Sequence, residues 1–260
     1  MNQSHTAAGK VLEGRTAIVT GGSRGIGRAV VRRLAADGAA VVFGYASNKE
    51  AAAETEAEVA ADGGTAWGVQ VELTELPQIE RLFVTADDHF RSVGAEGLDI
   101  LVNGAGVASM TPIGGTPEAE YDRVMAINAK GPFFAMQYAA QRLREGGRII
   151  NLSSVTTRWP RVPEAAYIAS KSAVEAFTRV GARELAARGI TVNTVSPGPS
   201  DTEMLHGATT EEIRQEVIGQ TPLGRLGRPA EVAAVVAFLA GPDGVWVTGQ
   251  NIRADGGLVY

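Results

Sequence analysis

Short apolar runs alternate with longer segments of helical periodicity along nearly the whole chain. The runs are rich in Val and Ile, as in TAIVT at 16–20, and unbroken apolar runs of this length are typical of strands buried on both faces of a sheet. Seven strands are expected, at 16–20, 40–45, 66–71, 98–103, 147–153, 190–196 and 250–254. Helices are expected between them, at 25–37, 48–61, 75–91, 117–144 with room for a bend, 165–188 and 229–240.

This alternation of strands and helices predicts the fold class. Parallel strands joined by helices require right-handed crossovers, which place helices on both faces of one sheet. We therefore expect an α/β protein with a single-domain Rossmann fold, a doubly wound sheet of seven parallel strands. Residues 1–13 lack periodicity and are expected to form a flexible tail before a single domain at 14–260. The irregular segment 199–219 is expected to form a lid over a ligand.

The composition excludes several classes of protein. The 260 residues carry 24 basic and 29 acidic side chains, for a net charge of −5, so nucleic acid and membrane surfaces are not expected as partners. Cysteine is absent, which excludes disulfides and thiolate chemistry. Neither a signal peptide nor a long apolar segment is recognisable, so a cytoplasmic protein is expected. His5, His89 and His206 have no partner at the spacing of metal ligands, and no metal is expected.

A glycine-rich turn follows the first expected strand. It reads GGSRGIG over 21–27 and leads into the helix expected at 25–37. Glycine lets the backbone approach a pyrophosphate, and the free N–H groups at a helix start favour an anion. The turn is therefore a candidate phosphate site, formed by Gly21, Ser23, Arg24, Gly25, Ile26 and Gly27.

The same turn also allows an interpretation as a serine hydrolase. Gly21, Ser23 and Gly25 match the Gly-x-Ser-x-Gly nucleophile elbow, which likewise lies between a strand and a helix. Such an enzyme needs a histidine and an acid later in the chain, and only His89 and His206 follow. With a single strand before the serine, there is no earlier strand end to supply the second oxyanion donor.

Tyr167 and Lys171 form a second candidate site. They lie four residues apart in the helix expected at 165–188, so their side chains share one face. An ammonium beside the phenol stabilises the phenolate and lowers the pKa of the tyrosine, which makes it a usable general acid or base near neutral pH. A tyrosine that packs on a lysine stem at the surface would show the same spacing.

Other polar residues end strands in the same layer. Ser154 follows the strand expected at 147–153 and can donate a hydrogen bond to a carbonyl oxygen. Asn103 ends the strand expected at 98–103, and Ala105 and Gly106 follow directly after it. Since open α/β sheets bind ligands at the carboxyl ends of their strands, these residues and the glycine-rich turn are expected to meet.

Together these motifs resemble those of the short-chain dehydrogenase/reductase family, over essentially the whole of 15–260. The resemblance implies a catalytic tetrad of Asn128, Ser154, Tyr167 and Lys171. In the mechanism of that family, Tyr167 would exchange the proton and Ser154 would orient the carbonyl. Lys171 would hold the nicotinamide ribose and lower the pKa of the tyrosine, and Asn128 would anchor a water of the proton relay.

The resemblance also implies contacts with a dinucleotide cofactor. Pro197, Gly198 and Thr202 match the family's Pro-Gly-x3-Thr segment that grips the nicotinamide carboxamide. Glu72 and Leu73 stand where Asp-Val commonly contacts adenine. Further cofactor contacts are implied for Asn103, Ala105, Gly106, Tyr167 and Lys171.

The end of the second expected strand bears on the choice of cofactor. An acidic residue there accepts hydrogen bonds from the ribose of NAD and would repel the 2′-phosphate of NADP. Here the strand ends at Tyr45, and Ser47 and Asn48 follow without a carboxylate. Arg24 in the phosphate turn can meet a 2′-phosphate with charge-assisted hydrogen bonds. NADP(H) is therefore favoured over NAD(H).

The family resemblance extends to 3-oxoacyl-carrier-protein reductases and to carbonyl, polyketide and naphthol reductases. It implies reduction of a small-molecule ketone to a secondary alcohol, with a homotetramer or dimer expected by analogy. Apolar residues near the lid and after Ser154 suit either a ketone pocket or a subunit interface, namely Met204, Leu205, Ile213, Val217, Trp159, Pro160 and Val162. A dinucleotide-binding sensor without catalysis is the alternative, although such a protein has no need for a tyrosine of altered pKa.

Overall fold

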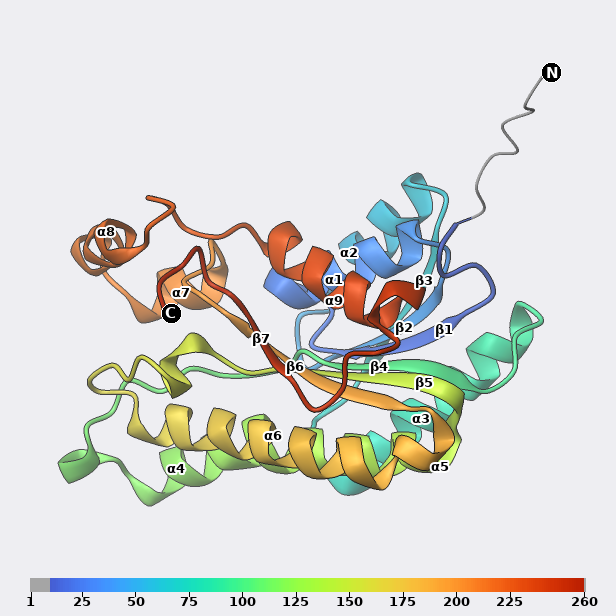
Figure 1. Cartoon of the computed structure of the whole chain (residues 1–260), viewed down its shortest axis with the longest axis horizontal. Coiled ribbons are helices and arrows are strands. Elements are labelled where there is room, and N and C mark those ends of the chain that lie inside the picture. Colours follow the sequence, from blue (N-terminus) through green and yellow to red (C-terminus); the bar gives the residue numbers. More distant parts are fainter. Residues whose placement is uncertain (1–9, 260) are drawn as a thin grey trace.

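The computed structural model describes residues 10–259 and contains one sheet of seven parallel strands (Figure 1). The strands are β1 (Thr16–Thr20), β2 (Ala40–Tyr45), β3 (Thr65–Gln70), β4 (Leu98–Asn103), β5 (Leu143–Leu152), β6 (Thr191–Pro197) and β7 (Asn251–Ala254). Their order is β3-β2-β1-β4-β5-β6-β7, so the direction of strand addition reverses between β1 and β4. This order confirms the expected doubly wound α/β fold.

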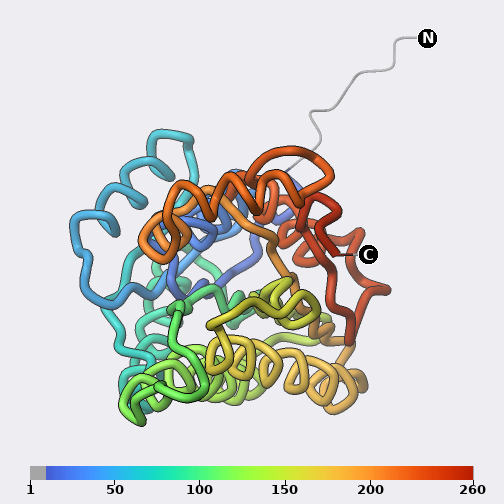
Figure 2. The backbone as a smooth tube through the Cα atoms, turned by 90° about the vertical axis from the view of Figure 1, so that its left-hand side faces the viewer, coloured from blue at the N-terminus to red at the C-terminus, as the bar shows by residue number. Residues whose placement is uncertain are grey.

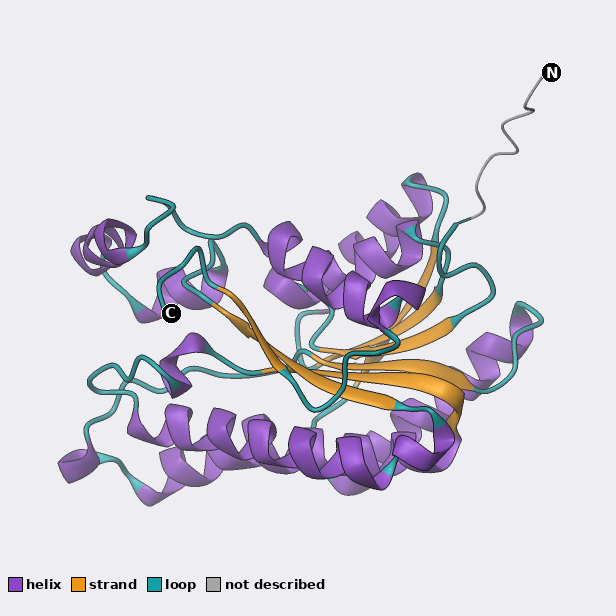
Figure 3. Cartoon of the chain, viewed as in Figure 1, coloured by secondary structure: helices purple, strands orange, loops and turns teal. Residues whose placement is uncertain are grey.

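Helices cover both faces of the sheet (Figure 3). One face carries α1 (Gly25–Ala36), α2 (Lys49–Ala61) and α9 (Pro229–Ala240), and the other carries α3 (Leu76–Ser92), α5 (Gly131–Arg142) and α6 (Ala165–Glu184), with α4 (Glu118–Met125) beside α6. Side chains alternate along each strand: Val41 and Phe43 pack toward α1, whereas Val42 packs toward α3. Burial on both faces explains the unbroken apolar runs of the strands. Within residues 10–259, none of the helices is both long and apolar enough to cross a bilayer.

The junction between the expected helix at 117–144 and the next strand differs from the prediction. The helix is observed as α4, a π-helical turn (Ala126–Lys130) and α5, and it ends at Arg142. Leu143 already pairs with Leu98, and the ladder resumes with Arg148 opposite Ile100. The four residues between Leu143 and Arg148 therefore oppose a single residue of β4 and form a bulge, in which Gly146 has a φ of 73°.

The amino-terminal boundary also differs from the prediction. Residues 11–14 form a turn, and Leu12 is buried in the core beneath α1. The N–H of Leu12 donates to the carbonyl oxygen of Asp37 at 2.8 Å. Order therefore begins before Arg15, because an apolar side chain in the expected tail finds a place in the core. The rest of that tail, residues 1–9, lies outside the described part of the chain.

The segment expected as a lid contains two short helices, α7 (Glu203–Ala208) and α8 (Glu211–Gln220). Both lie beyond the carboxyl ends of the strands, as Figure 2 shows in orange from that end of the molecule. The segment therefore lies at the carboxyl edge of the sheet, and its role as a lid stays a prediction.

A buried carboxylate joins three strands at the opposite edge of the sheet. The Asp99 side chain is 1% exposed and accepts hydrogen bonds from Arg15 Nη1 at 2.8 Å, the Thr16 N–H at 2.8 Å and Arg144 Nε at 2.9 Å. Burial acts to raise the pKa of Asp99, but the hydrogen bonds from Arg144, Thr16 and Arg15 outweigh it, and the pKa lies below its ordinary value. The ionised carboxylate therefore contributes to stability.

Replacing Asp99 is expected to destabilise the protein because several donors lose their acceptor. Asp99→Ala should lower the free energy of unfolding by about 2–3 kcal/mol, somewhat less than for a fully buried pair since both arginines are partly exposed. The control Asp88→Ala breaks an exposed pair with Arg91 and should cost less than about 1 kcal/mol. Urea unfolding measures both values, and equal losses would contradict the argument.

The same carboxylate predicts a pH dependence. Its folded pKa lies below the unfolded value of about 4, so its contribution is present above pH 4 and is lost as the pH falls through the folded pKa. The difference in unfolding free energy between the wild type and Asp99→Ala should therefore shrink below about pH 4.

Candidate active site

A cavity of about 380 Å³ opens at the carboxyl edge of the sheet, beside the reversal of strand order between β1 and β4. Open α/β sheets bind their ligands at this point. The cavity is lined by the turns and loops after β1, β2, β4, β5 and β6 and by the lid helices. It brings together most of the expected site residues: Gly21, Ser23, Arg24, Gly25, Ile26, Gly27, Tyr45, Ser47, Asn48, Glu72, Leu73, Ala105, Gly106, Ser154, Tyr167, Lys171, Pro197, Gly198 and Thr202.

The turn after β1 depends on close backbone approaches that exclude side chains. A Cβ on Gly21 would lie 2.7 Å from the Cα of Ala105, and a Cβ on Gly27 would lie 2.0 Å from the carbonyl oxygen of Gly21. Thr20 Oγ1 accepts hydrogen bonds from the N–H groups of Gly104 at 3.2 Å and Ala105 at 3.3 Å. Within the described chain, the N-cap side chain of α1 makes no capping hydrogen bond, and the first turn holds no acidic residue. The start of α1 is therefore open to an anion.

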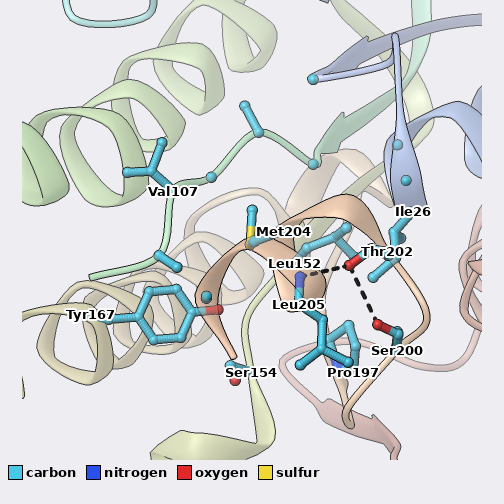
Figure 4. Close-up of a pocket in the computed structure, with 18 of the residues that line it drawn as sticks. Ile26, Val107, Leu152, Ser154, Tyr167, Pro197, Ser200, Thr202, Met204 and Leu205 are labelled. Atoms are coloured by element: carbon cyan, nitrogen blue, oxygen red, sulfur yellow. Dashed lines mark hydrogen bonds between the residues drawn. The ribbon is translucent and has the colours of Figure 1, made fainter. Parts of the chain in front are cut away.

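Tyr167, Ser154 and Lys171 line the same cavity. Figure 4 shows Tyr167 and Ser154 side by side. The hydroxyl of Tyr167 points toward Ser154, whose Oγ accepts hydrogen bonds from the N–H and the hydroxyl of Thr156 at 3.2 and 2.9 Å. Lys171 Nζ lies 5.9 Å from the ring centroid of Tyr167 and donates to the carbonyl oxygen of Leu152 at 3.0 Å. β5 and α6 thus hold a phenol, a hydroxyl and an ammonium in one place.

Burial shifts the pKa values of Tyr167 and Lys171. It raises the pKa of Tyr167 to about 12. The hydrogen bond with Ser154 lowers this pKa, and the charge of Glu164 raises it further. It lowers the pKa of Lys171 to about 8. We expected the ammonium of Lys171 to lower the pKa of the tyrosine, but the pKa is raised, with burial as the largest cause. The phenol is therefore protonated at neutral pH, which is the form that can donate a proton.

Two expected site residues, Asn103 and Asn128, lie outside the cavity. Asn103 is buried, and its Nδ2 donates to Asn151 Oδ1 at 2.8 Å. The side chain of this last residue of β4 turns inward, and the chain reaches the cavity only after it, so the expected cofactor contact of Asn103 stays a prediction. Asn128, in the π-helical turn, accepts from the Val107 N–H at 2.8 Å and donates to the Val107 carbonyl at 2.9 Å. It supports the loop after β4, and its role as a water anchor stays a prediction.

The lid and the loop after β5 contribute apolar side chains to the cavity wall, namely Met204, Leu205, Val217 and Trp159. Three apolar residues expected at the same wall lie outside it: Ile213, Pro160 and Val162. Thr202 Oγ1 accepts a hydrogen bond from the Leu205 N–H at 3.3 Å, which caps α7 at the cavity (Figure 4).

The geometry does not favour a hydrolase that uses Ser23. Ser23 lies just before α1, and in residues 10–259 the two histidines that follow it have other partners. His89 stacks on Trp67 with ring centroids 4.8 Å apart, and His206 Nε2 hydrogen-bonds Asp201 Oδ1 at 2.7 Å. In this part of the chain neither histidine hydrogen-bonds Ser23, which leaves it without the general base that a serine nucleophile requires.

Three charged residues of the cavity were not expected from the sequence, namely Arg161, Glu164 and Glu203. Glu164 is 8% exposed and begins α6, and its Oε1 lies 4.0 Å from Arg161 Nη1. Burial raises the pKa of Glu164, and the positive charge of Arg161 opposes this rise. The available signal was the spacing: Glu164 precedes Tyr167 by three residues, and residues three apart share a helix face.

A family model described as Enoyl-(Acyl carrier protein) reductase matches residues 21–259. The chain belongs to the short-chain dehydrogenase/reductase family. This confirms the resemblance of its motifs, and the family makes the chain an oxidoreductase.

Relatives and solved structures of short-chain dehydrogenases/reductases match the chain along its length. An uncharacterized oxidoreductase of Methylorubrum extorquens is 44% identical over 249 residues, which cover 95% of this chain and 98% of that protein. A probable tetrahydroxynaphthalene reductase of Zymoseptoria tritici is 39% identical over 257 residues, which cover 94% of each chain. The structure of the angucycline C-6 ketoreductase LanV with bound NADP is 41% identical, with a TM-score of 0.92 and coverage of 98% of this chain and 99% of that one.

The lowered pKa of Lys171 in this dehydrogenase/reductase can be measured directly by NMR. In protein with carbon-13-labelled lysine, the Lys171 Cε signal should titrate near pH 8, because burial disfavours the ammonium. A lysine in water titrates near pH 10.4. Lysine occurs at only four positions, and Lys171→Arg identifies the signal. A midpoint above pH 10 would contradict the argument.

Proposed function

We propose that this chain is an NADP(H)-dependent ketoreductase that reduces a ketone to a secondary alcohol, with Tyr167 as the general acid. The observation that carries the proposal is the phenol of Tyr167 directed at Ser154, in the same cavity as the glycine-rich turn at the start of α1. A phosphate site and a proton donor in one cavity are what reduction by a dinucleotide requires.

The side chains suit the charge that develops during reduction. The ketone oxygen becomes negative as its carbon accepts the hydride that a bound nicotinamide supplies. The hydroxyls of Ser154 and Tyr167 can both donate to this oxygen, and Tyr167 then gives up its proton. The ammonium of Lys171, whose pKa of about 8 leaves it mostly charged at neutral pH, stabilises the resulting phenolate.

The residues at the adenosine end fit a cofactor with a 2′-phosphate. The loop after β2 places Tyr45, Ser47 and Asn48 at the cavity, and none of these residues carries a carboxylate. Arg24 is well exposed, and its Nη1 lies 3.4 Å from Oε2 of the equally exposed Glu203. Such a surface pair is weak, so the guanidinium is free to meet a phosphate. The NADP bound to LanV supports this preference.

The substrate that we propose is a ring ketone of the polyketide type. Trp159, Met204 and Leu205 present apolar surface to the cavity, which suits a flat ring system. The tetrahydroxynaphthalene and angucycline reductases among the relatives support this class. A 3-oxoacyl chain is the alternative, and a homotetramer or dimer stays an expectation from family analogy.

Removing the proposed acid tests the reaction. Tyr167→Phe should lower kcat for ketone reduction about 10²- to 10⁴-fold, while the Kd for NADPH changes less than about 3-fold, because the phenol serves proton transfer. NADPH absorbance reports turnover over a panel of β-ketoesters, quinones and aromatic cyclic ketones. Tyr121→Phe, at an exposed tyrosine, is the matched control. Unchanged turnover in Tyr167→Phe would overturn the assignment, and tight NADPH binding without turnover in the wild type would favour the sensor alternative.

The role of Arg24 predicts a change in cofactor preference. Arg24→Ala should lower kcat/KM for NADPH about 10- to 100-fold, because a charge-assisted hydrogen bond to the 2′-phosphate is lost. The kcat/KM for NADH, which has no 2′-phosphate, should stay nearly unchanged. Arg32→Ala on the same helix removes an arginine that pairs with Asp62 away from the cavity, and serves as the control. Equal losses for both cofactors would contradict recognition of the 2′-phosphate.

A further inference from the structure

The cavity contains a buried carboxyl group that has no part in the proposed reaction. Glu164 lines the cavity and is 8% exposed. Within residues 10–259 its carboxyl oxygens accept no hydrogen bond, and its charged neighbour, Arg161 Nη1, lies 4.0 Å away. Because Glu164 lines the cavity, these oxygens are available to a hydrogen-bond donor on a bound molecule.

Helix capping does not account for this carboxyl group. Glu164 is the N-cap residue of α6, where a side-chain oxygen ordinarily accepts a hydrogen bond from an N–H of the first turn. Thr202 and Thr210 do so at the starts of α7 and α8, at 3.3 and 3.4 Å. The Glu164 side chain makes no such bond. Its oxygens are therefore available on the cavity side.

Two observations place the carboxyl group where a substrate would bind. It precedes Tyr167 by three residues on the first turn of α6, and its charge raises the pKa of the Tyr167 phenol. The loop before it carries Trp159 and Arg161, whose guanidinium carbon lies 5.7 Å from the indole centroid. The carboxyl group thus lines the same cavity as Tyr167 and Trp159.

The charges around this position select the kind of donor. A negative carboxylate disfavours an anionic group, and the guanidinium of Arg161 disfavours an ammonium. A neutral O–H group satisfies the acceptor without either repulsion. We propose that Glu164 accepts a hydrogen bond from a hydroxyl group of the substrate, so that the enzyme selects ring ketones that carry a hydroxyl. This inference rests on the proposed ketoreductase function and adds the group that its cavity recognises.

The test compares a ring ketone with and without the donor. The substrates are 1-tetralone, its four isomers with one hydroxyl on the aromatic ring, and the corresponding methoxy compounds, which cannot donate. The wild type should prefer one hydroxylated isomer to 1-tetralone by about 10-fold or more in kcat/KM, since a site built around a substrate hydroxyl rejects the analogue that lacks it. The matching methoxy compound should lose the preference, and this comparison needs no variant.

Variants then assign the preference to Glu164. Glu164→Met should remove most of the preference for the hydroxylated isomer. The ratio of its kcat/KM to that of 1-tetralone should fall close to the ratio that the wild type shows between the matching methoxy compound and 1-tetralone. Glu164→Gln keeps an acceptor oxygen and should retain part of the preference. Intrinsic reactivity of the ketones cancels when these ratios are compared between proteins. Glu118→Met, at the exposed start of α4, is the matched control and should keep the wild-type ratio.

The outcomes separate this inference from the function on which it rests. Reduction of tetralones with equal kcat/KM for hydroxylated and methoxy compounds, or with an unchanged ratio in Glu164→Met, overturns hydroxyl recognition and leaves the ketoreductase standing. Binding of NADPH without reduction of any of the ring ketones overturns the proposed substrate class and the inference together.

Discussion

The close contact between the turn after β1 and the loop after β4 is the constraint on which the site depends. The turn can approach Ala105 only because Gly21 has no Cβ, and Thr20 holds the two segments together through the N–H groups of Gly104 and Ala105. This contact opens the cavity at the reversal of strand order and leaves the start of α1 free beside it. A side chain at Gly21 would push the start of α1 away from the loop after β4.

Burial then gives the remaining side chains their chemistry. Burial raises the pKa values of Tyr167 and Glu164 and lowers the pKa of Lys171. In each case the wall of the cavity replaces water, which disfavours the charged form of the side chain. Tyr167 and Lys171 lie on the first two turns of α6 and Glu164 is its N-cap residue, so one helix positions a phenol, a cation and a carboxyl group. A single rigid element is a precise support for groups that must act on one molecule.

The cavity and the buried Asp99 lie at opposite edges of the sheet, separated by the length of the strands. Asp99 joins β1, β4 and β5 at the amino edge with hydrogen bonds from two arginines and a backbone N–H, far from the cavity. The carboxyl edge carries polar side chains, such as Ser154, that are directed at a ligand. Substitutions at the two edges should therefore affect stability and activity largely independently.

The sequence by itself determined the strands, the order of elements and most of the cavity. Periodicity located β1, β2 and β4 to the residue, and spacing paired Tyr167 with Lys171, because these features are local and repeat with the geometry of a strand or a helix. Tertiary structure alone decided the inward side chain of Asn103, the burial of Leu12 and Glu164, and the raised pKa of Tyr167. Burial and long-range contacts depend on segments far apart in the chain, and no local pattern reports the surroundings that they create.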